Sequence, residues 1–258
     1  MKKYGYIYIL ILLIITIGIF YFCFISKREP LAIIGAMDDE INEFITNLDN
    51  KKHTKYSDFE IYTGNINKEK IVLAKSGVGK VNAATTTQYI IDKYKPKYII
   101  NTGLAGSISP DLKAGDILIA SKMVQHDFDI TAFGTAKGYM NTDIEPDKPT
   151  LYYSDKNLIN DFINKSKDKN IKEGTIATGD IFVSDKQIKN NIRKEFNADL
   201  VDMESAAIAQ TAQRNNIPVI ILRAVSDELN DNEKEYKQNK QNIALKSALT
   251  VIEILNNK

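Results

Sequence analysis

The stretch VIILRAVSD, residues 219–227, decides the fold. It is an apolar run that ends in Ser226 and Asp227, and short apolar runs of this kind are typical of strands buried on both faces of a sheet. Three other stretches have the same form: LAIIGAMDDE at 31–40, YIINTGLAG at 98–106 and LVDME at 200–204. We predict strands over 31–36, 98–101, 200–202 and 219–225, and a Gly-rich turn over 102–106.

Helical patterns separate these runs. We predict helices over 38–47, 79–94, 185–196, 204–215 and 238–255, and further strands over 59–64, 70–76 and 174–178. Short apolar strands that alternate with helices predict an α/β domain whose largely parallel sheet is covered by helices on both faces. The 228 residues from 31 to 258 are long enough for a single core, and no Gly/Ser/Pro linker divides them.

Acidic residues gather where the predicted strands end. Ligands bind at the carboxyl ends of strands in such sheets. Acids after strands also cap helices, because carboxylates favour helix N-termini, and we prefer this interpretation for Asp38 and Asp39. Glu204 and Asp227 sit directly on apolar strand ends, which favours a functional interpretation for these two.

Composition excludes several classes of protein. Hydrophobic residues make up 43% and charged residues 26% of the 258 residues, which excludes a disordered or collagen-like chain. Lys and Arg total 34 against 33 Asp and Glu, and this balance argues against a nucleic-acid binder. One cysteine excludes an intrachain disulfide, and with only two histidines we expect no metal site and no cofactor.

The N-terminal residues include a long uncharged apolar stretch. Residues 7–25 contain no charge, and these 19 residues are enough to cross most of a ~30 Å hydrocarbon core. Lys27 and Arg28 end the run. We interpret residues 1–29 as an uncleaved signal anchor first and a signal peptide second, with the enzyme-sized domain, residues 30–258, outside the cytoplasmic membrane. Lipidation of Cys23 is a further alternative, although the bulky Phe22 precedes it.

Seven motifs in order resemble one family. They are IGAMDDE at 34–40, KSGVGK at 75–80, INTGLAG at 100–106, GD at 115–116, TGDIFV at 178–183, VDME at 201–204 and RAVSD at 223–227. Together they resemble the 5′-methylthioadenosine/S-adenosylhomocysteine nucleosidases, over about residues 31–255. The resemblance implies a three-layer αβα sandwich with a mixed, largely parallel sheet. It also implies a homodimer that hydrolyses the N-glycosidic bond of adenine thionucleosides, in methionine and adenine salvage.

The resemblance also implies roles for individual residues. Breaking the bond leaves negative charge on adenine and positive charge on the ribosyl ring, so an acid and a base are needed on opposite sides. Asp227 is the implied acid at adenine N7, and Glu40 is the implied base that activates water. Glu204 is expected to hold the ribose hydroxyls. The other implied substrate-binding residues are Met37, Gly106, Phe133, Phe182, Val183, Met203, Arg223 and Ser226.

Each remaining role is a specific expectation. Met203 packs on the sugar, Phe182 stacks on adenine, and the backbone of Val183 reads the adenine edge. Arg223 and Ser226 orient the water and the acid, and Gly106 lets the backbone approach the substrate. Phe133 reaches the alkylthio group across the dimer or, as the alternative, only packs at the interface.

Four residues depart from the family pattern. Thr135 and Asn141 stand where some homologues have Tyr and Pro in the lid that crosses the dimer. Leu104 stands where many members have Ser, and Asp202 where Glu is usual, which puts the rate and the preference for the 5′ substituent in doubt.

Two other functions stay open. Acidic residues at 38–40 would repel a phosphate dianion, so we favour a hydrolase over a phosphorylase. The lysines among residues 165–172 suggest a surface polyanion-binding protein as the other alternative, but acidic residues dilute that stretch.

Overall fold

The computed structural model describes residues 16, 29–56, 59–140, 145–168, 170–230 and 233–257. Its strands are β1 (Leu31–Gly35), β2 (Asp49–Tyr56), β3 (Phe59–Ile66), β4 (Glu69–Lys75), β5 (Tyr98–Ser107), β6 (Ile117–Gln125), β7 (Leu151–Tyr153), β8 (Lys172–Thr178), β9 (Leu200–Asp202) and β10 (Val219–Asp227). Its helices are α2 (Asp38–Asn47), α3 (Lys80–Tyr94), α4 (Lys156–Lys165), α5 (Lys186–Phe196), α6 (Ser205–Arg214), α7 (Glu233–Asn256) and the short 3₁₀ helix η1 (Thr131–Phe133).

The strands form one mixed sheet in the order β10-β6-β8-β9-β5-β1-β4-β3-β2. The central strands β4, β1, β5 and β10 run parallel to their neighbours in that group, and β6, β8 and β9 form a second parallel group. The antiparallel pairings lie at the β2–β3–β4 edge, at β7, and where the two groups join. Because β10 pairs with both β5 and β6, the strands from β10 to β5 close on themselves.

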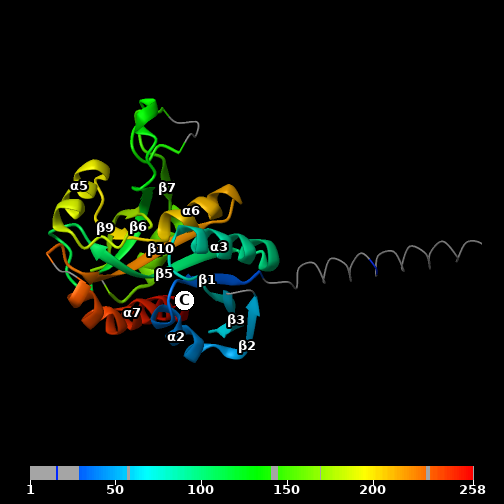
Figure 1. Cartoon of the computed structure of the whole chain (residues 1–258). Coiled ribbons are helices and arrows are strands. Elements are labelled where there is room, and N and C mark those ends of the chain that lie inside the picture. The colour runs from blue at the N-terminus through cyan, green and yellow to red at the C-terminus, as the bar shows by residue number, and fades with distance from the viewer. Residues whose placement is uncertain are drawn as a thin grey trace, which may run out of the picture.

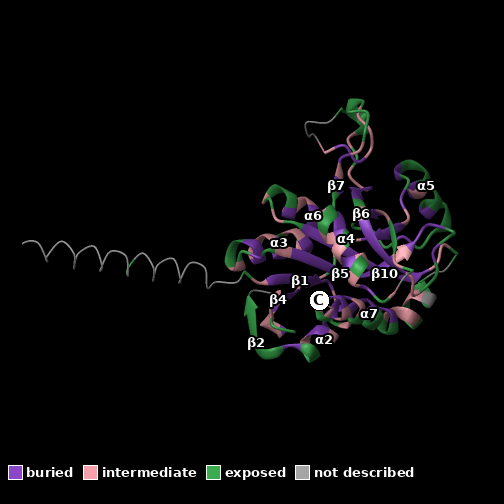
Figure 2. Ribbon diagram, turned by 180° about the vertical axis from the view of Figure 1, so that it is seen from behind, coloured by how far each residue is buried: buried purple, intermediate pink, exposed green. Residues whose placement is uncertain are grey.

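Helices cover both faces of the sheet, which confirms the three-layer α/β architecture. Figure 1 shows α3 and α6 on one side of the strands and α2 and α7 on the other. One buried apolar cluster joins the strands to α3 and α6, and a second joins them to α2, α4 and α7. The strands between the layers are the buried part of the molecule (Figure 2), and every residue of β1 and β10 is buried. This burial explains why those strands are continuous apolar runs.

Two predicted boundaries were wrong. The expected turn at 102–106 is the second half of β5, where Thr102 to Ala105 continue the parallel pairing with β10. Helix α7 begins at Glu233, five residues before its predicted start at 238. The reason for the first error is that glycines mark close packing as well as turns: at Gly103 a Cβ would overlap Glu40 and Arg223.

Five elements were not expected from the sequence: β2, β6, β7, α4 and the short helix η1. Strand β2 consists entirely of exposed residues, so no apolar alternation indicated it.

The predicted membrane anchor at residues 7–25 lies outside the described part of the structure, apart from residue 16. Among the residues that are described, we find no helix with the length and apolar character to span a membrane.

Candidate active site

A cavity lies at the carboxyl ends of β1, β5, β9 and β10, where the strands were expected to carry a ligand site. Its empty volume is about 580 Å³, which includes open solvent at its mouth. Nine of the predicted site residues line it: Met37, Glu40, Gly106, Phe182, Val183, Met203, Glu204, Ser226 and Asp227. A tenth, Arg223, is completely buried and contacts carboxylates of the site.

Glu40 is held at the start of α2 by backbone N–H groups. Its Oε2 accepts hydrogen bonds from the N–H groups of Ala36 at 2.6 Å and Met37 at 3.1 Å, and its Oε1 accepts one from Leu104 at 2.9 Å. Burial raises the pKa of Glu40, opposed by Arg223 and by these three N–H groups. Leu104, which stands where the resembled family often has Ser, still contacts Glu40, because this hydrogen bond comes from its backbone N–H and not from its side chain.

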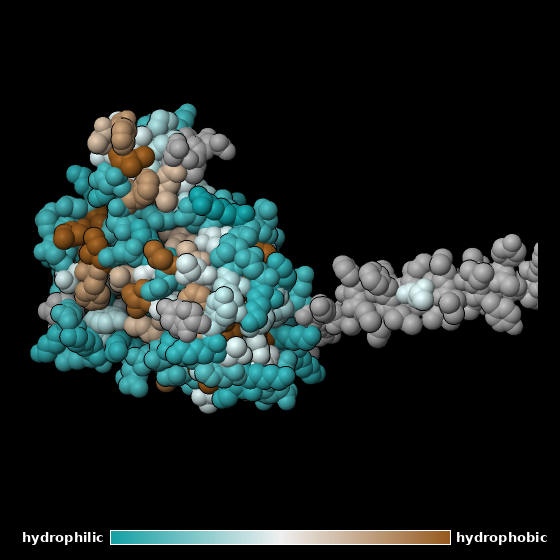
Figure 3. Space-filling model, turned by 45° about the vertical axis from the view of Figure 1, so that its right-hand side comes forward, coloured by the Kyte–Doolittle hydropathy of each residue, from teal (hydrophilic) through white to brown (hydrophobic). Residues whose placement is uncertain are grey.

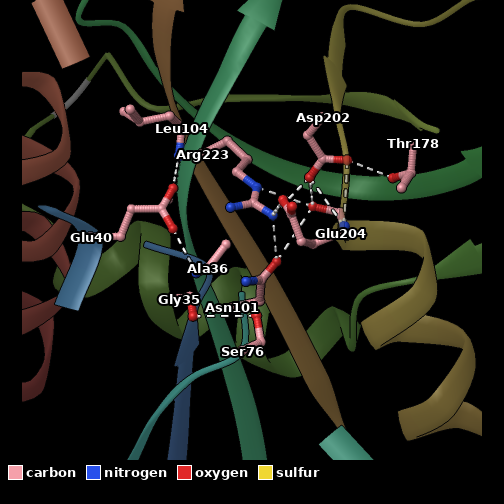
Figure 4. Close-up of polar contacts among 12 residues, drawn as sticks. Gly35, Ala36, Glu40, Ser76, Asn101, Leu104, Thr178, Asp202, Glu204 and Arg223 are labelled. Atoms are coloured by element: carbon pink, nitrogen blue, oxygen red, sulfur yellow. Dashed lines mark hydrogen bonds and ion pairs between the residues drawn. The ribbon is translucent and has the colours of Figure 1, made fainter. Parts of the chain in front are cut away.

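Arg223 is the central cation of the site (Figure 4). Its Nη2 lies 2.7 Å from Asp202 Oδ2 and 3.6 Å from Glu204 Oε2, and it donates to Asn101 Oδ1 at 2.9 Å. Burial disfavours the charged guanidinium, but the carboxylates of Asp202, Glu204 and Glu40 raise the pKa of Arg223. The side chain is therefore a fixed positive charge.

One nitrogen of this guanidinium has no partner in the described part of the chain. Nη1 of Arg223 is buried and makes no hydrogen bond among the described residues. A Cβ at Gly103 would overlap both this nitrogen and Glu40 Oε1, so the bare glycine lets the two side chains lie on the same side of β5. A buried N–H group without a partner is costly, and Arg223 itself is not among the residues that line the cavity.

Asp202 links Arg223 to the start of α6, because its carboxylate contacts both. Its carboxylate accepts hydrogen bonds from Thr178 Oγ1 at 2.6 Å and from the backbone N–H and hydroxyl of Ser205. Ser205 Oγ in turn lies 3.1 Å from Arg223 Nε, which donates to it. The shorter Asp202 side chain thus still reaches the guanidinium.

Glu204 is a second buried acid of the cavity with a raised pKa. Its Oε1 accepts a hydrogen bond of 3.0 Å from the Gly79 N–H, and its side chain is only 7% exposed. Burial raises the pKa of Glu204 to about 8, although Arg223 lowers it. Acids with such shifts are concentrated at functional sites.

Asp227 ends β10 and is held on both oxygens. Ser226 Oγ donates to Oδ1 at 2.7 Å, and Lys189 Nζ lies 3.1 Å from Oδ2. A Cβ at Gly106 would lie 3.0 to 3.2 Å from the two oxygens, so the carboxyl packs against this glycine. The predicted pairing of Ser226 with the acid is present in the geometry.

Two residues of the site were missed from the sequence. Tyr236 of α7 lines the cavity, packs edge-on against Phe182 with ring centroids 5.3 Å apart, and places its hydroxyl 3.8 Å from Met37 Sδ. Lys189 reaches the acid from α5. The signal for Lys189 was available: with Ile192 and Phe196 it forms the buried face of its helix, an unusual position for a lysine.

Phe133 lies apart from the cavity in this chain. It belongs to η1, between β6 and β7, where the described residues project from the body of the molecule (Figure 1). Its side chain is 84% exposed, so its expected contact with the alkylthio group of a partner's substrate stays a prediction. Among the described residues, no group of three or more His, Cys, Asp or Glu is placed to hold a metal ion.

Comparisons with known proteins agree on one family. The Phosphorylase superfamily profile matches residues 30–256. A 5′-methylthioadenosine/S-adenosylhomocysteine nucleosidase of Anoxybacillus flavithermus is 39% identical over 202 residues, which are 76% of this chain and 84% of the relative.

Solved structures agree with the sequence relatives. The Neisseria meningitidis nucleosidase of the same name, in complex with methylthio-immucillin-A, has a TM-score of 0.81 and 36% identity, with 88% of this chain and 99% of that chain covered. Futalosine hydrolase of Helicobacter pylori has a TM-score of 0.80 and 28% identity, with 88% and 97% covered.

Proposed function

This chain belongs to the Phosphorylase superfamily, and we propose that it is a 5′-methylthioadenosine/S-adenosylhomocysteine nucleosidase. It hydrolyses the N-glycosidic bond and releases adenine and a 5-thio-substituted ribose. The observation that carries this conclusion is one cavity lined by four buried acidic residues, of which Glu40, Glu204 and Asp227 lie in different surroundings and Asp202 binds Arg223. Acid, base and cation-stabilising roles require carboxyl groups whose environments differ.

Asp227 supplies the proton to the leaving base. Its carboxyl lies against Gly106, where the absence of a side chain leaves room for the carboxyl itself. Ser226 Oγ, 2.7 Å from Oδ1, fixes the orientation of the carboxyl. Protonation of N7 lets adenine leave as a neutral base, and general acid catalysis of this kind contributes roughly 10²–10⁴-fold to a rate.

Glu40 and Arg223 act on the attacking water. Burial raises the pKa of Glu40, which makes its carboxylate a stronger base for a water proton. Nη1 of Arg223, which no described protein atom accepts from, lies on the same side of β5 and is available to orient the water.

Glu204 and Met203 bind the sugar. Glu204 has its carboxyl in the cavity, where it binds the ribose hydroxyls. The neighbouring Met203 offers an adaptable apolar surface to the sugar. Phe182, packed edge-on against Tyr236, stacks on adenine, and the Val183 backbone reads the edge of the base.

Water is the favoured nucleophile rather than phosphate. Nη2 of Arg223 is already engaged by Asp202 Oδ2 at 2.7 Å and by Asn101 Oδ1 at 2.9 Å. This part of the cation is therefore bound by the protein and is not left to bind a phosphate dianion. Two of the lysines that suggested polyanion binding form ion pairs: Lys165 pairs with Asp161 at 2.9 Å and Lys172 with Asp116 at 2.9 Å.

Product analysis tests this function. The protein is incubated with methylthioadenosine, adenosylhomocysteine, 5′-deoxyadenosine or futalosine in phosphate buffer, and the sugar product is identified by mass spectrometry. We expect adenine and free methylthioribose from methylthioadenosine. A ribose 1-phosphate product would show a phosphorylase, and turnover of futalosine alone would make the protein a futalosine hydrolase.

A homodimer completes the cavity in our proposal. Figure 3 shows apolar patches exposed on the face of the molecule that it presents. Val78, Ile181 and Phe182 line the cavity and are still 45 to 53% exposed, and a partner subunit would cover such a rim. Phe133 of the partner then faces the alkylthio group. Sedimentation equilibrium tests the dimer, and a monomer at catalytic concentrations would contradict it.

The N-terminal segment is proposed to anchor the enzyme. The support is the 19 uncharged residues at 7–25, followed by Lys27 and Arg28. The anchor is retained and places residues 30–258 outside the cytoplasmic membrane, where the enzyme would act on exported nucleosides. Protease treatment of intact spheroplasts tests this: digestion of the domain is expected, and its protection would place it on the cytoplasmic side.

A further inference from the structure

Lys189 is a lysine in a position that normally holds an apolar residue. On α5 the buried residues are Lys189, Ile192 and Phe196, spaced as one face of a helix, and Lys189 is 0% exposed. Moving an ammonium out of water costs several kcal/mol unless a counter-charge meets it. The buried position of this lysine therefore has to be explained by its partners.

Its partners lie at the end of β10. Nζ of Lys189 is 3.1 Å from Asp227 Oδ2 and donates to the Glu228 carbonyl oxygen at 3.0 Å. The Glu228 carboxylate is engaged by Lys113 at 3.0 Å. Asp227 is thus the buried carboxyl on which the ammonium acts, and α5 is tied through it to the wall of the cavity.

The two oxygens of Asp227 are held by two different donors. The Ser226 hydroxyl reaches Oδ1, and the Lys189 ammonium reaches Oδ2. Asp227 itself is 4% exposed, so water does little to stabilise its ionised form. A carboxyl that must lose a proton in such a place needs a cation beside it.

We propose that Lys189 is a positioning residue that holds Asp227 against Gly106 and serves as its counter-ion when the proton passes to the leaving base. This role rests on the proposed function, in which Asp227 is the acid. As the glycosidic bond breaks, the O–H bond of Asp227 breaks and an N–H bond forms at the purine. Asp227 becomes a carboxylate, and Nζ of Lys189 lies 3.1 Å from its Oδ2. The ammonium therefore stabilises the charge that develops during the reaction.

Stability alone does not account for the lysine. Replacing a buried ion pair by apolar residues is often neutral or stabilising, and the neighbouring positions on this face are Ile192 and Phe196. An apolar residue at 189 would extend the cluster that those two form with Val183 and Val201. A role in the chemistry explains why the charge is placed there.

The test compares two substrates in the full-length protein. Lys189→Met removes the charge at similar length, and Lys194→Met is the matched control, because Lys194 is exposed on the same helix. Adenine release from methylthioadenosine needs the acid, whereas a 4-nitrophenyl 5-methylthioriboside releases nitrophenolate without a proton. We expect Lys189→Met to lower kcat on methylthioadenosine by roughly 10- to 100-fold, with KM little changed, and to alter turnover of the nitrophenyl riboside by less than about threefold.

Two further variants separate this role from a structural one. Lys189→Arg keeps the charge and is expected to restore part of the lost kcat. In an Asp227→Asn background, Lys189→Met should cost less than about threefold, because it acts through the acid. Equal losses on both substrates, additive losses in the double variant, or wild-type kcat for Lys189→Met would overturn the proposal. If the wild-type protein releases no adenine, the proposed function itself fails.

Discussion

Glu204 is a residue whose raised pKa should make the free energy of unfolding depend on pH. Burial raises its pKa from 4.5 to about 8. Below pH 4.5 the side chain is neutral in both the folded and the unfolded chain. Between pH 4.5 and 8 the unfolded chain loses the proton while the folded chain keeps it. The free energy of unfolding therefore falls as the pH rises through this range.

Replacing this acid by Gln should remove that slope. Glu204→Gln keeps an acceptor for the Gly79 N–H but has no proton to lose. Without substrate, we expect the free energy of unfolding of the wild type to fall by roughly 3 kcal/mol relative to the variant between pH 5 and 8.5. Urea unfolding at both pH values measures this difference, and parallel pH dependences would contradict the assignment.

Gly103 is the glycine that the charged cluster requires. A Cβ there would overlap Glu40 and Arg223, both of which are buried and fixed by several hydrogen bonds. Gly103→Ala should therefore destabilise the fold by about 2–4 kcal/mol and lower kcat at least tenfold. Gly106→Ala is the graded comparison, because its Cβ would meet Asp227 oxygens at 3.0 and 3.2 Å. Equal stability of the two variants would show that the cluster adapts freely.

At the scale of elements, buried strands were predictable and polar ones were not. β1 and β10 are apolar along most of their length because both faces are buried, and their predicted positions are confirmed. Strand β2, DNKKHTKY, has no buried residue, and its pairing with β3 depends on a partner rather than on its own pattern. The sequence signal there is absent because the strand depends on tertiary context.

In the site, too, the residues at the ends of buried strands were predictable, and two that lie on helices were not. Residues at the ends of buried strands, such as Asp227, were found because strand ends converge in this fold. Lys189 and Tyr236 come from helices, and only three-dimensional packing brings them to the cavity. The Lys189 position on a buried helix face was visible in the sequence, but its partner 38 residues away was not.

Helix α4 offers a test that is independent of the site. Its N-cap, Asp155, accepts hydrogen bonds from the N–H groups of Asn157 at 2.9 Å and Leu158 at 3.0 Å. Asp155→Ala should lower the free energy of unfolding by about 1 kcal/mol and leave kcat on methylthioadenosine unchanged, because α4 contributes nothing to the cavity lining. Urea unfolding and a rate assay measure the two effects, and a large loss of activity would mean that α4 supports the site.

At the scale of the whole molecule, the fold joins distant parts of the chain into one charge arrangement. Glu40 follows β1, Glu204 follows β9, and Asp227 ends β10, and the three line the same cavity. Arg223 enters from β10 between them and the other carboxylate, Asp202. Because Nη2 of Arg223 is already engaged by Asp202 and Asn101, this arrangement favours water over phosphate as the nucleophile.

The most direct test of the account is adenine release from methylthioadenosine, measured with and without phosphate for the wild type and for Asp227→Asn. The account predicts wild-type turnover that does not depend on phosphate, and a fall in kcat of roughly 10²-fold or more in the variant. Turnover that requires phosphate, or an Asp227→Asn variant as active as the wild type, would contradict it.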